Sequence, residues 1–236
     1  MSGWNLFETH DLVRKRFDRK QELLVRDCTR SIVDRQNFGR FHYHEVLRLA
    51  KSFERKHLSE KLLFELHASD EIREAFERFI IKAGAHATAC IQSVHAIPDI
   101  LANALYYACG LNLSSAAIPE LKVNVIEVVK ALKRQPSSQA LANTLSKTIE
   151  GPGWDHLSAI SNMSKHRSVI RSSLNEDWTG KRKNHREIQF AIFERGGKQY
   201  WSKSLQDAIG PEYDRLSMLV TACGHELNRW LRETAA

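Results

Sequence analysis

Apolar positions spaced at helical intervals run through most of the chain. Residues 9–36, "THDLVRKRFDRKQELLVRDCTRSIVDRQ", place apolar side chains three or four positions apart among dense charge, which predicts one long amphipathic helix. The segment 37–44, "NFGRFHYH", is predicted to interrupt this helix, and shorter helices are expected over 45–56 and 59–67. The first part of the chain is therefore predicted to be helical.

A second long helix is expected from Ser69 onward. Serine is a preferred N-cap residue, and two acidic side chains follow it in the first turn. The apolar pattern continues to Tyr107, with a kink predicted before Pro98, and Gly110 is expected to end the helix. Further helices are predicted over 118–133, 136–148, 153–171 and 210–233.

Residues 187–201 follow a different pattern, in which apolar residues alternate with others on both sides of Gly196-Gly197. Alternation around a tight glycine turn predicts a β-hairpin. The fold is therefore predicted to be all-α for the most part, a helical bundle with one inserted hairpin. Two regions are expected, a basic helical region over 1–68 and the bundle over 69–236.

Composition adds a preferred kind of partner to this picture. The 236 residues include 35 Lys and Arg against 28 Asp and Glu, and the net charge of +7 favours polyanions, nucleic acid first and an acidic membrane surface second. No two of the four cysteines are close enough for a CxxC site. A signal peptide is not expected, because the N-terminal residues have no apolar core of the required length, and no stretch approaches the length of about 20 apolar residues that a membrane span needs. A reduced cytoplasmic protein without a membrane partner is expected.

One stripe of the second long helix is polar yet holds no Lys, Arg or Glu. Three hypotheses remain open for it: a partly buried hydrogen-bonded network in which Asp99 fixes the tautomer of His95, a solvent-facing stripe, or a functional cleft. We call this stripe the polar seam; at 100° per residue its members share one face, and they are Thr88, Gln92, His95, Asp99 and Asn103.

The stretch "SNMSKHRSVIRSS" (161–173) concentrates residues that could act on a phosphodiester. On the predicted helix, Asn162 and His166 lie one turn apart at the edge of the apolar face. His166 would serve as acid or base, and Lys165 and Arg167 would supply positive charge. The plainer interpretation is a structural histidine with solvated neighbours.

The basic character continues beyond this helix. Between residues 165 and 186 the chain has seven Lys or Arg against two acids, and Trp178 adds an aromatic ring of the kind on which bases stack. The residues predicted to contact nucleic acid are Lys165, Arg167, Arg171, Lys181, Arg182, Lys183 and Arg186.

Other chemistries find little support in the sequence. It contains no glycine-rich phosphate loop, no HExxH and no GxSxG. His42 and His44 lie two positions apart, but nothing nearby completes a ligand set. No metal site and no cofactor are expected.

The polar seam, the later helix with Asn162 and His166 among basic residues, and the final "GHELNRWL" helix together resemble the HEPN superfamily. The resemblance covers roughly 70–236. It implies a helical bundle, usually a homodimer, of a kind frequent in bacterial toxin and anti-phage systems and often a metal-independent ribonuclease.

The ribonuclease motif of that superfamily is an Arg, then four to six intervening residues, then a His. His166 matches the histidine, and Asn162 matches a polar residue that often follows the Arg. The positions for the arginine, 159 to 161, hold Ala, Ile and Ser, so the motif is incomplete. The lead hypothesis is a HEPN-like RNA-binding protein with His166 and Asn162 as catalytic residues of a weak or degenerate ribonuclease. The alternative is a non-catalytic interaction or dimerisation module.

Overall fold

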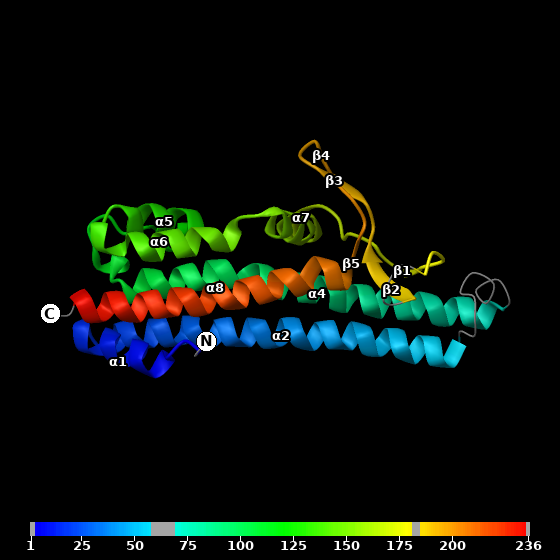
Figure 1. Ribbon diagram of the computed structural model, residues 1–236, viewed down its shortest axis with the longest axis horizontal. Helices are drawn as coiled ribbons and strands as arrows, with labels where there is room; N and C mark the ends of the chain where they lie inside the picture. The colour runs from blue at the N-terminus through cyan, green and yellow to red at the C-terminus, as the bar shows by residue number, and fades with distance from the viewer. Residues whose placement is uncertain (1–2, 58–68, 181–184, 235–236) are drawn as a thin grey trace. The chain divides into compact units, whose positions relative to one another are not determined.

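The computed structural model describes residues 3–57, 69–180 and 185–234, and these residues are mostly helical (Figure 1). The all-α prediction is therefore confirmed at this level. The helices are α1 (Leu6–Arg16), α2 (Arg19–His57), α4 (Asp70–Ala108), α5 (Val125–Lys133), α6 (Gln139–Ser146), α7 (Pro152–His166) and α8 (Leu205–Thr234). Short 3-10 turns lie at Leu111–Leu113, Glu120–Lys122, Pro136–Ser138 and Lys147–Ile149.

The first break in the helical pattern lies earlier than predicted. Helix α2 runs without interruption through 37–44, so the break predicted there is wrong. The chain breaks instead at Phe17-Asp18, where the Asp18 carboxylate accepts the backbone N–H of Gln21 at 2.8 Å and caps the new helix. The helix predicted over 59–67 lies outside the described residues. Helix α4 has the predicted extent, and Gly110 follows it with a φ of 66°.

The strands form two small antiparallel groups. Strand β2 (Arg186–Phe190) is central, between β1 (Ser172–Glu176) and β5 (Lys203–Ser204). Strands β3 (Phe193–Arg195) and β4 (Lys198–Tyr200) form a hairpin closed by two glycines with φ of 60° and 75°.

The hairpin prediction is confirmed over 193–200, whereas residues 187–190 pair with β1, which the sequence did not predict. Helix α7 ends at His166 rather than at 171, because the backbone N–H groups of Arg167 and Ser168 both bond to the Met163 carbonyl.

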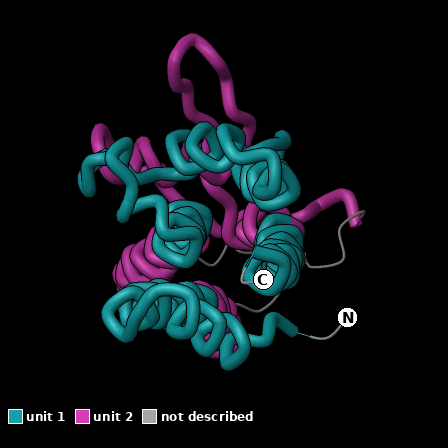
Figure 2. Tube along the Cα trace, turned by 90° about the vertical axis from the view of Figure 1, so that its left-hand side faces the viewer, with its two compact units in different colours: residues 1–36, 96–155, 212–236 teal, residues 37–95, 156–211 magenta. Residues whose placement is uncertain are grey.

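The chain forms two compact units (Figure 2). Unit 1 comprises residues 1–36, 96–155 and 212–236, and unit 2 comprises 37–95 and 156–211. Long helices therefore contribute to both units, α2 up to residue 36 to one and from residue 37 to the other. The division predicted near residue 68 lies outside the described residues and stays a prediction.

Unit 1 is an all-helical assembly around an aliphatic core. The largest enclosed side chains include Leu101 and Leu105 of α4 and Leu132 of α5. A buried hydrogen bond of 2.6 Å from the Thr9 hydroxyl to the Asn228 side chain joins α1 to α8. The unit is thus stabilised by apolar burial, supplemented by satisfied polar contacts.

Unit 2 combines helices with the strands. Phe53 of α2 stacks on Phe79 of α4, with ring centroids 4.8 Å apart and planes 7° from parallel. Ile91, Ile160 and Phe190, from α4, α7 and β2, are almost completely buried. The buried residues of unit 2 thus come from three segments that are far apart in sequence, and the candidate site lies on the same helices.

Candidate functional site

Ser158 of α7 connects two groups of residues that the sequence pointed to separately. The Asn162 side-chain amide donates to the Ser158 hydroxyl oxygen at 3.1 Å. The Nε2 atom of His95, on α4, lies 3.4 Å from the same oxygen. The helical spacing of residues 158 and 162 makes the first contact, and the packing of α4 against α7 makes the second. We call His95, Ser158 and Asn162 the polar network.

Burial keeps His95 of this network uncharged. Desolvation, with a smaller contribution from the positive charges of Lys165 and Arg195, lowers its pKa from 6.5 to about 4. The ring is therefore neutral at pH 7, with one nitrogen donating and the other accepting. The network can offer hydrogen bonds to a ligand without carrying a charge of its own.

Arg195 lies near His95 because the hairpin of β3 and β4 is fixed on α7. The His156 ring contacts Phe193 edge-on, with centroids 6.0 Å apart, and Tyr200 at 5.6 Å. Phe193 and Tyr200 face each other across the hairpin and stack at 4.9 Å. Arg195 lies two residues beyond Phe193 and therefore shares its face of the strand.

Two cations, Lys165 and Arg195, lie close enough to the polar network to act on His95, and two more follow Lys165 in the sequence. All are exposed, and none forms an ion pair with any residue in the described ranges. We call them the cationic surface; they are Lys165, Arg167, Arg171 and Arg195. Exposed guanidinium and ammonium groups without carboxylate partners are available to an anion.

His166 lies at the last position of α7 and is exposed. Its ring makes no hydrogen bond within the described part of the chain. The catalytic role of His166 and Asn162 stays a prediction. Only Asn162 joins the polar network.

The other residues of the predicted basic tract have different surroundings. Lys181, Arg182 and Lys183 lie outside the described residues. The side chain of Arg186 is only 9 % exposed and donates to the Glu176 carboxylate, with Nε to Oε1 and Nη2 to Oε1 both 2.7 Å. Arg186 thus holds β2 against β1 across a buried ion pair.

The polar seam does not behave as one stripe. Gln92 and His95 are half-buried, and His95 bonds toward α7. Asp99 is exposed, and its carboxylate accepts the backbone N–H of Val125 at 3.2 Å at the start of α5. The role of Asp99 in fixing the His95 tautomer stays a prediction.

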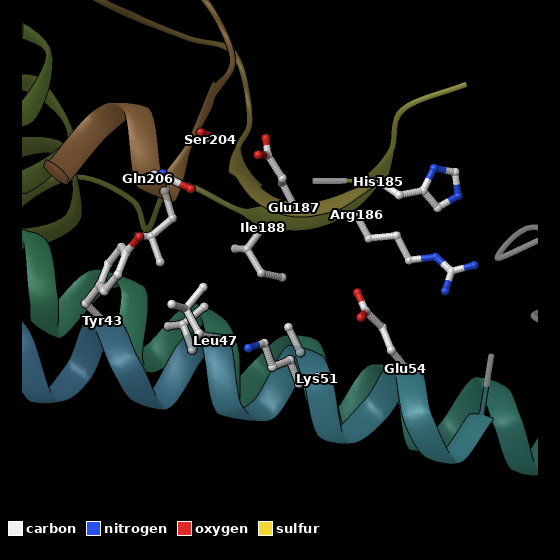
Figure 3. A pocket seen from close by; sticks show the side chains of 13 residues that line it. Tyr43, Leu47, Lys51, Glu54, His185, Arg186, Glu187, Ile188, Ser204 and Gln206 are labelled. Atoms are coloured by element: carbon white, nitrogen blue, oxygen red, sulfur yellow. The ribbon is translucent and has the colours of Figure 1, made fainter. Parts of the chain in front are cut away.

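A trough in unit 2 was not anticipated from the sequence. It has a volume of about 620 Å³ and lies between one face of α2, strand β2 and the beginning of α8 (Figure 3). The Glu54 carboxylate points toward Arg186 at one end, and the Tyr43 hydroxyl points toward Gln206 at the other. Desolvation raises the pKa of Glu54.

Ser158 and Arg195 were also missed. Ser158 precedes Asn162 by one helical turn, and this spacing was a usable indication of contact. No such indication existed in the sequence for Arg195, because the proximity of Arg195 to His95 depends on how the hairpin packs.

No family model, no curated protein and no solved structure matches the chain. None of the helices in the described ranges is long and apolar enough to cross a membrane. Within the same ranges, no three His, Cys, Asp or Glu side chains gather as a group that could hold a metal ion.

Proposed function

We propose that unit 2 binds nucleic acid, with RNA as the preferred ligand, through the cationic surface of Lys165, Arg167, Arg171 and Arg195. The observation that carries the proposal is that these exposed cations lack ion pairs among the described residues, while two of them adjoin the polar network. Phosphodiesters are the biological anions that several separate cations suit best.

The distribution of charge supports the same conclusion. Unit 2 has 19 Lys and Arg against 13 Asp and Glu, which leaves +6, whereas unit 1 has 16 against 15, which leaves +1. Nearly all of the net charge of +7 therefore belongs to the unit that carries the cationic surface. Charge concentrated in this way steers a polyanion toward one part of a protein.

The polar network would supply neutral contacts beside these charges. The amide of Asn162, the hydroxyl of Ser158 and the neutral ring of His95 can donate to or accept from a phosphate oxygen or a ribose hydroxyl. Such contacts fix the position of a strand that the cations attract.

The HEPN resemblance extends the proposal to a weak, metal-independent ribonuclease in a bacterial toxin or anti-phage system, acting as a homodimer. His166 would take the proton of a ribose 2′-hydroxyl as its oxygen bonds to the adjacent phosphorus. The bond to the 5′-oxygen then breaks, and that oxygen receives a proton from an acid or water, leaving a 2′,3′-cyclic phosphate. Lys165 or Arg167 would stabilise the charge that develops on the phosphoryl oxygens.

A non-catalytic interaction module is the second candidate, and one observation favours it. Ile192 and Trp201 flank the hairpin, 47 % and 69 % exposed, on the face opposite to Phe193 and Tyr200. Aromatic and aliphatic side chains exposed together are common where proteins associate.

Binding of a fluorescein-labelled single-stranded RNA, measured by fluorescence anisotropy, tests the proposal. Replacing Lys165, Arg167 and Arg171 with Gln should weaken binding by about tenfold or more, as three exposed charge contacts of up to about 1 kcal/mol each imply. The control removes three exposed cations of unit 2 that already have acidic partners, and it should change affinity by no more than about twofold because it leaves the cationic surface intact. The control residues are Arg48, Arg73 and Arg78.

Equal losses in the two triple variants would contradict the cationic surface as the binding site. For the ribonuclease part, His166→Ala should retain binding and lose formation of cyclic-phosphate ends. Cleavage that persists in His166→Ala would assign the activity to another group. The interaction module would be favoured if the protein associates with itself without RNA and Trp201→Ala abolishes that association.

A further inference from the structure

The trough of unit 2 has a floor of mixed character, apolar at its middle with charged side chains beside it. Residues of α2 at positions 43, 47, 51 and 54 face it, which is one side of the helix over about 16 Å at 1.5 Å per residue. Leu47 and Ile188 lie opposite each other across its middle, from α2 and β2 (Figure 3). Leu47 remains 39 % exposed, so this floor is open to a ligand.

A single unpaired cation stands in the same apolar middle. Lys51 lines the trough, and its side chain lies back along α2 toward Leu47 (Figure 3). Within the described residues its ammonium group forms no ion pair, although Glu54 is only three positions away. A cation beside apolar walls gives a ligand both a charge partner and a surface to cover.

Two carboxylates, Glu54 and Glu187, also line the trough, and neither lies within ion-pair distance of the Lys51 ammonium group. Glu54 has its pKa raised by burial, so it loses its charge more readily than an ordinary carboxyl as the pH falls. Glu176, outside the lining, is occupied by Arg186. Glu187 is the remaining carboxylate that lines the trough. It would favour a cationic ligand, which is the alternative to an anionic one.

We propose that this trough binds an amphipathic organic anion, a carboxylate or sulfonate on an apolar body, with the anionic group on Lys51 and the body on Leu47 and Ile188. The volume of about 620 Å³ lies within the range of small-molecule sites. The lining differs from the cationic surface, because it combines Lys51 and Arg186 with Glu54 and Glu187 beside apolar side chains. Such a mixture suits a small amphiphile and not a phosphodiester chain. The proposal is therefore independent of nucleic-acid binding.

The probe for the test is 8-anilinonaphthalene-1-sulfonate, an aromatic sulfonate whose fluorescence rises in apolar sites. Saturable binding to the full chain is expected. Lys51→Met should weaken binding of the probe by about tenfold, because it removes one charge contact at an apolar site. Leu47→Asp should weaken binding by more than that, because it places a carboxylate on the floor of the trough. The matched controls on α4 are Lys82→Met and Ile81→Asp, both at exposed positions, and both should leave the affinity within about twofold of the unmodified chain.

Competition identifies the class of ligand. Octanoate should displace the probe. At the same concentration, octylamine and inorganic phosphate should not displace it. 1-Octanol should compete about tenfold more weakly than octanoate, because it lacks the negative charge. Displacement by octylamine in preference to octanoate would overturn the anionic assignment. Equal losses in the trough variants and their controls would show that the probe covers apolar surface elsewhere. Circular dichroism of Lys51→Met and Leu47→Asp confirms that each remains folded.

Discussion

Replacing His95 with Gln should make the stability of the protein less sensitive to acid. The imidazole is protonated near pH 6.5 in the unfolded chain, whereas burial lowers its pKa to about 4 in the folded chain. The unfolded state therefore takes up the proton first, so stability is full above pH 6.5 and falls as the pH drops toward 4. The whole difference corresponds to about 3.4 kcal/mol, of which about 2 kcal/mol falls between pH 7.5 and pH 5.

Solvent screening at a half-buried ring reduces this expectation to about 1 kcal/mol. Urea unfolding followed by circular dichroism at 222 nm gives the free energy of unfolding at both pH values. Between pH 7.5 and pH 5, His95→Gln should lose about 1 kcal/mol less than the unmodified protein. Glutamine retains an amide that can reach Ser158, so the change in hydrogen bonding is small.

The control is His44→Gln, which removes an exposed histidine of the same unit and should leave the difference between the two pH values unchanged. If His95→Gln keeps the full acid sensitivity of the unmodified protein, the assignment of His95 as a neutral, half-buried member of the polar network is refuted.

Three further variants or measurements test other parts of the structure. Gly224→Ala should lower the melting temperature by several degrees, because a Cβ atom there would lie 2.1 Å from Trp4 Cγ and displace the indole. Arg186→Met should cost about 3 kcal/mol in urea unfolding by leaving the buried Glu176 charge without its arginine, and adding Glu176→Gln should recover part of it. Thiol titration at pH 8 should be slow in the folded protein and immediate in denaturant, because burial raises the pKa of four thiols to about 11 or 12: Cys28, Cys90, Cys109 and Cys223.

The helices were predictable where local sequence alone determines them. The long apolar pattern of α4 and the glycine at its end gave its extent, because both act within a few residues. The break predicted over 37–44 failed, since Gly39 costs a helix only about 1 kcal/mol and tertiary packing easily compensates for that amount. Here the Cys90 thiol of α4 lies 3.1 Å from the Gly39 carbonyl. The actual break carried a local indication that was overlooked, an aspartate three residues before Gln21.

The strands and the site depended on contacts that no local pattern contains. Strand β1 is specified by pairing with β2, whose paired positions lie 10 to 18 residues further along the chain. Its own sequence, "SSLNE", has little strand character. Sequence spacing indicated Asn162 and His95 separately, but their connection through Ser158 requires α4 and α7 to pack side by side. The basic tract was recognised from its composition, which could not show that Arg186 is buried while Arg167 is exposed.

The salt dependence of RNA binding tests the central claim most directly. Each phosphate contact with a single strand contributes about 0.7 to the slope of log K against log salt concentration, so removing three contacts should reduce the slope by about 2. The account predicts this reduction when Lys165, Arg167 and Arg171 become Gln, and an unchanged slope when the three ion-paired arginines of the control variant become Gln. A slope that is the same in both variants and in the unmodified protein would contradict the claim that the cationic surface binds nucleic acid.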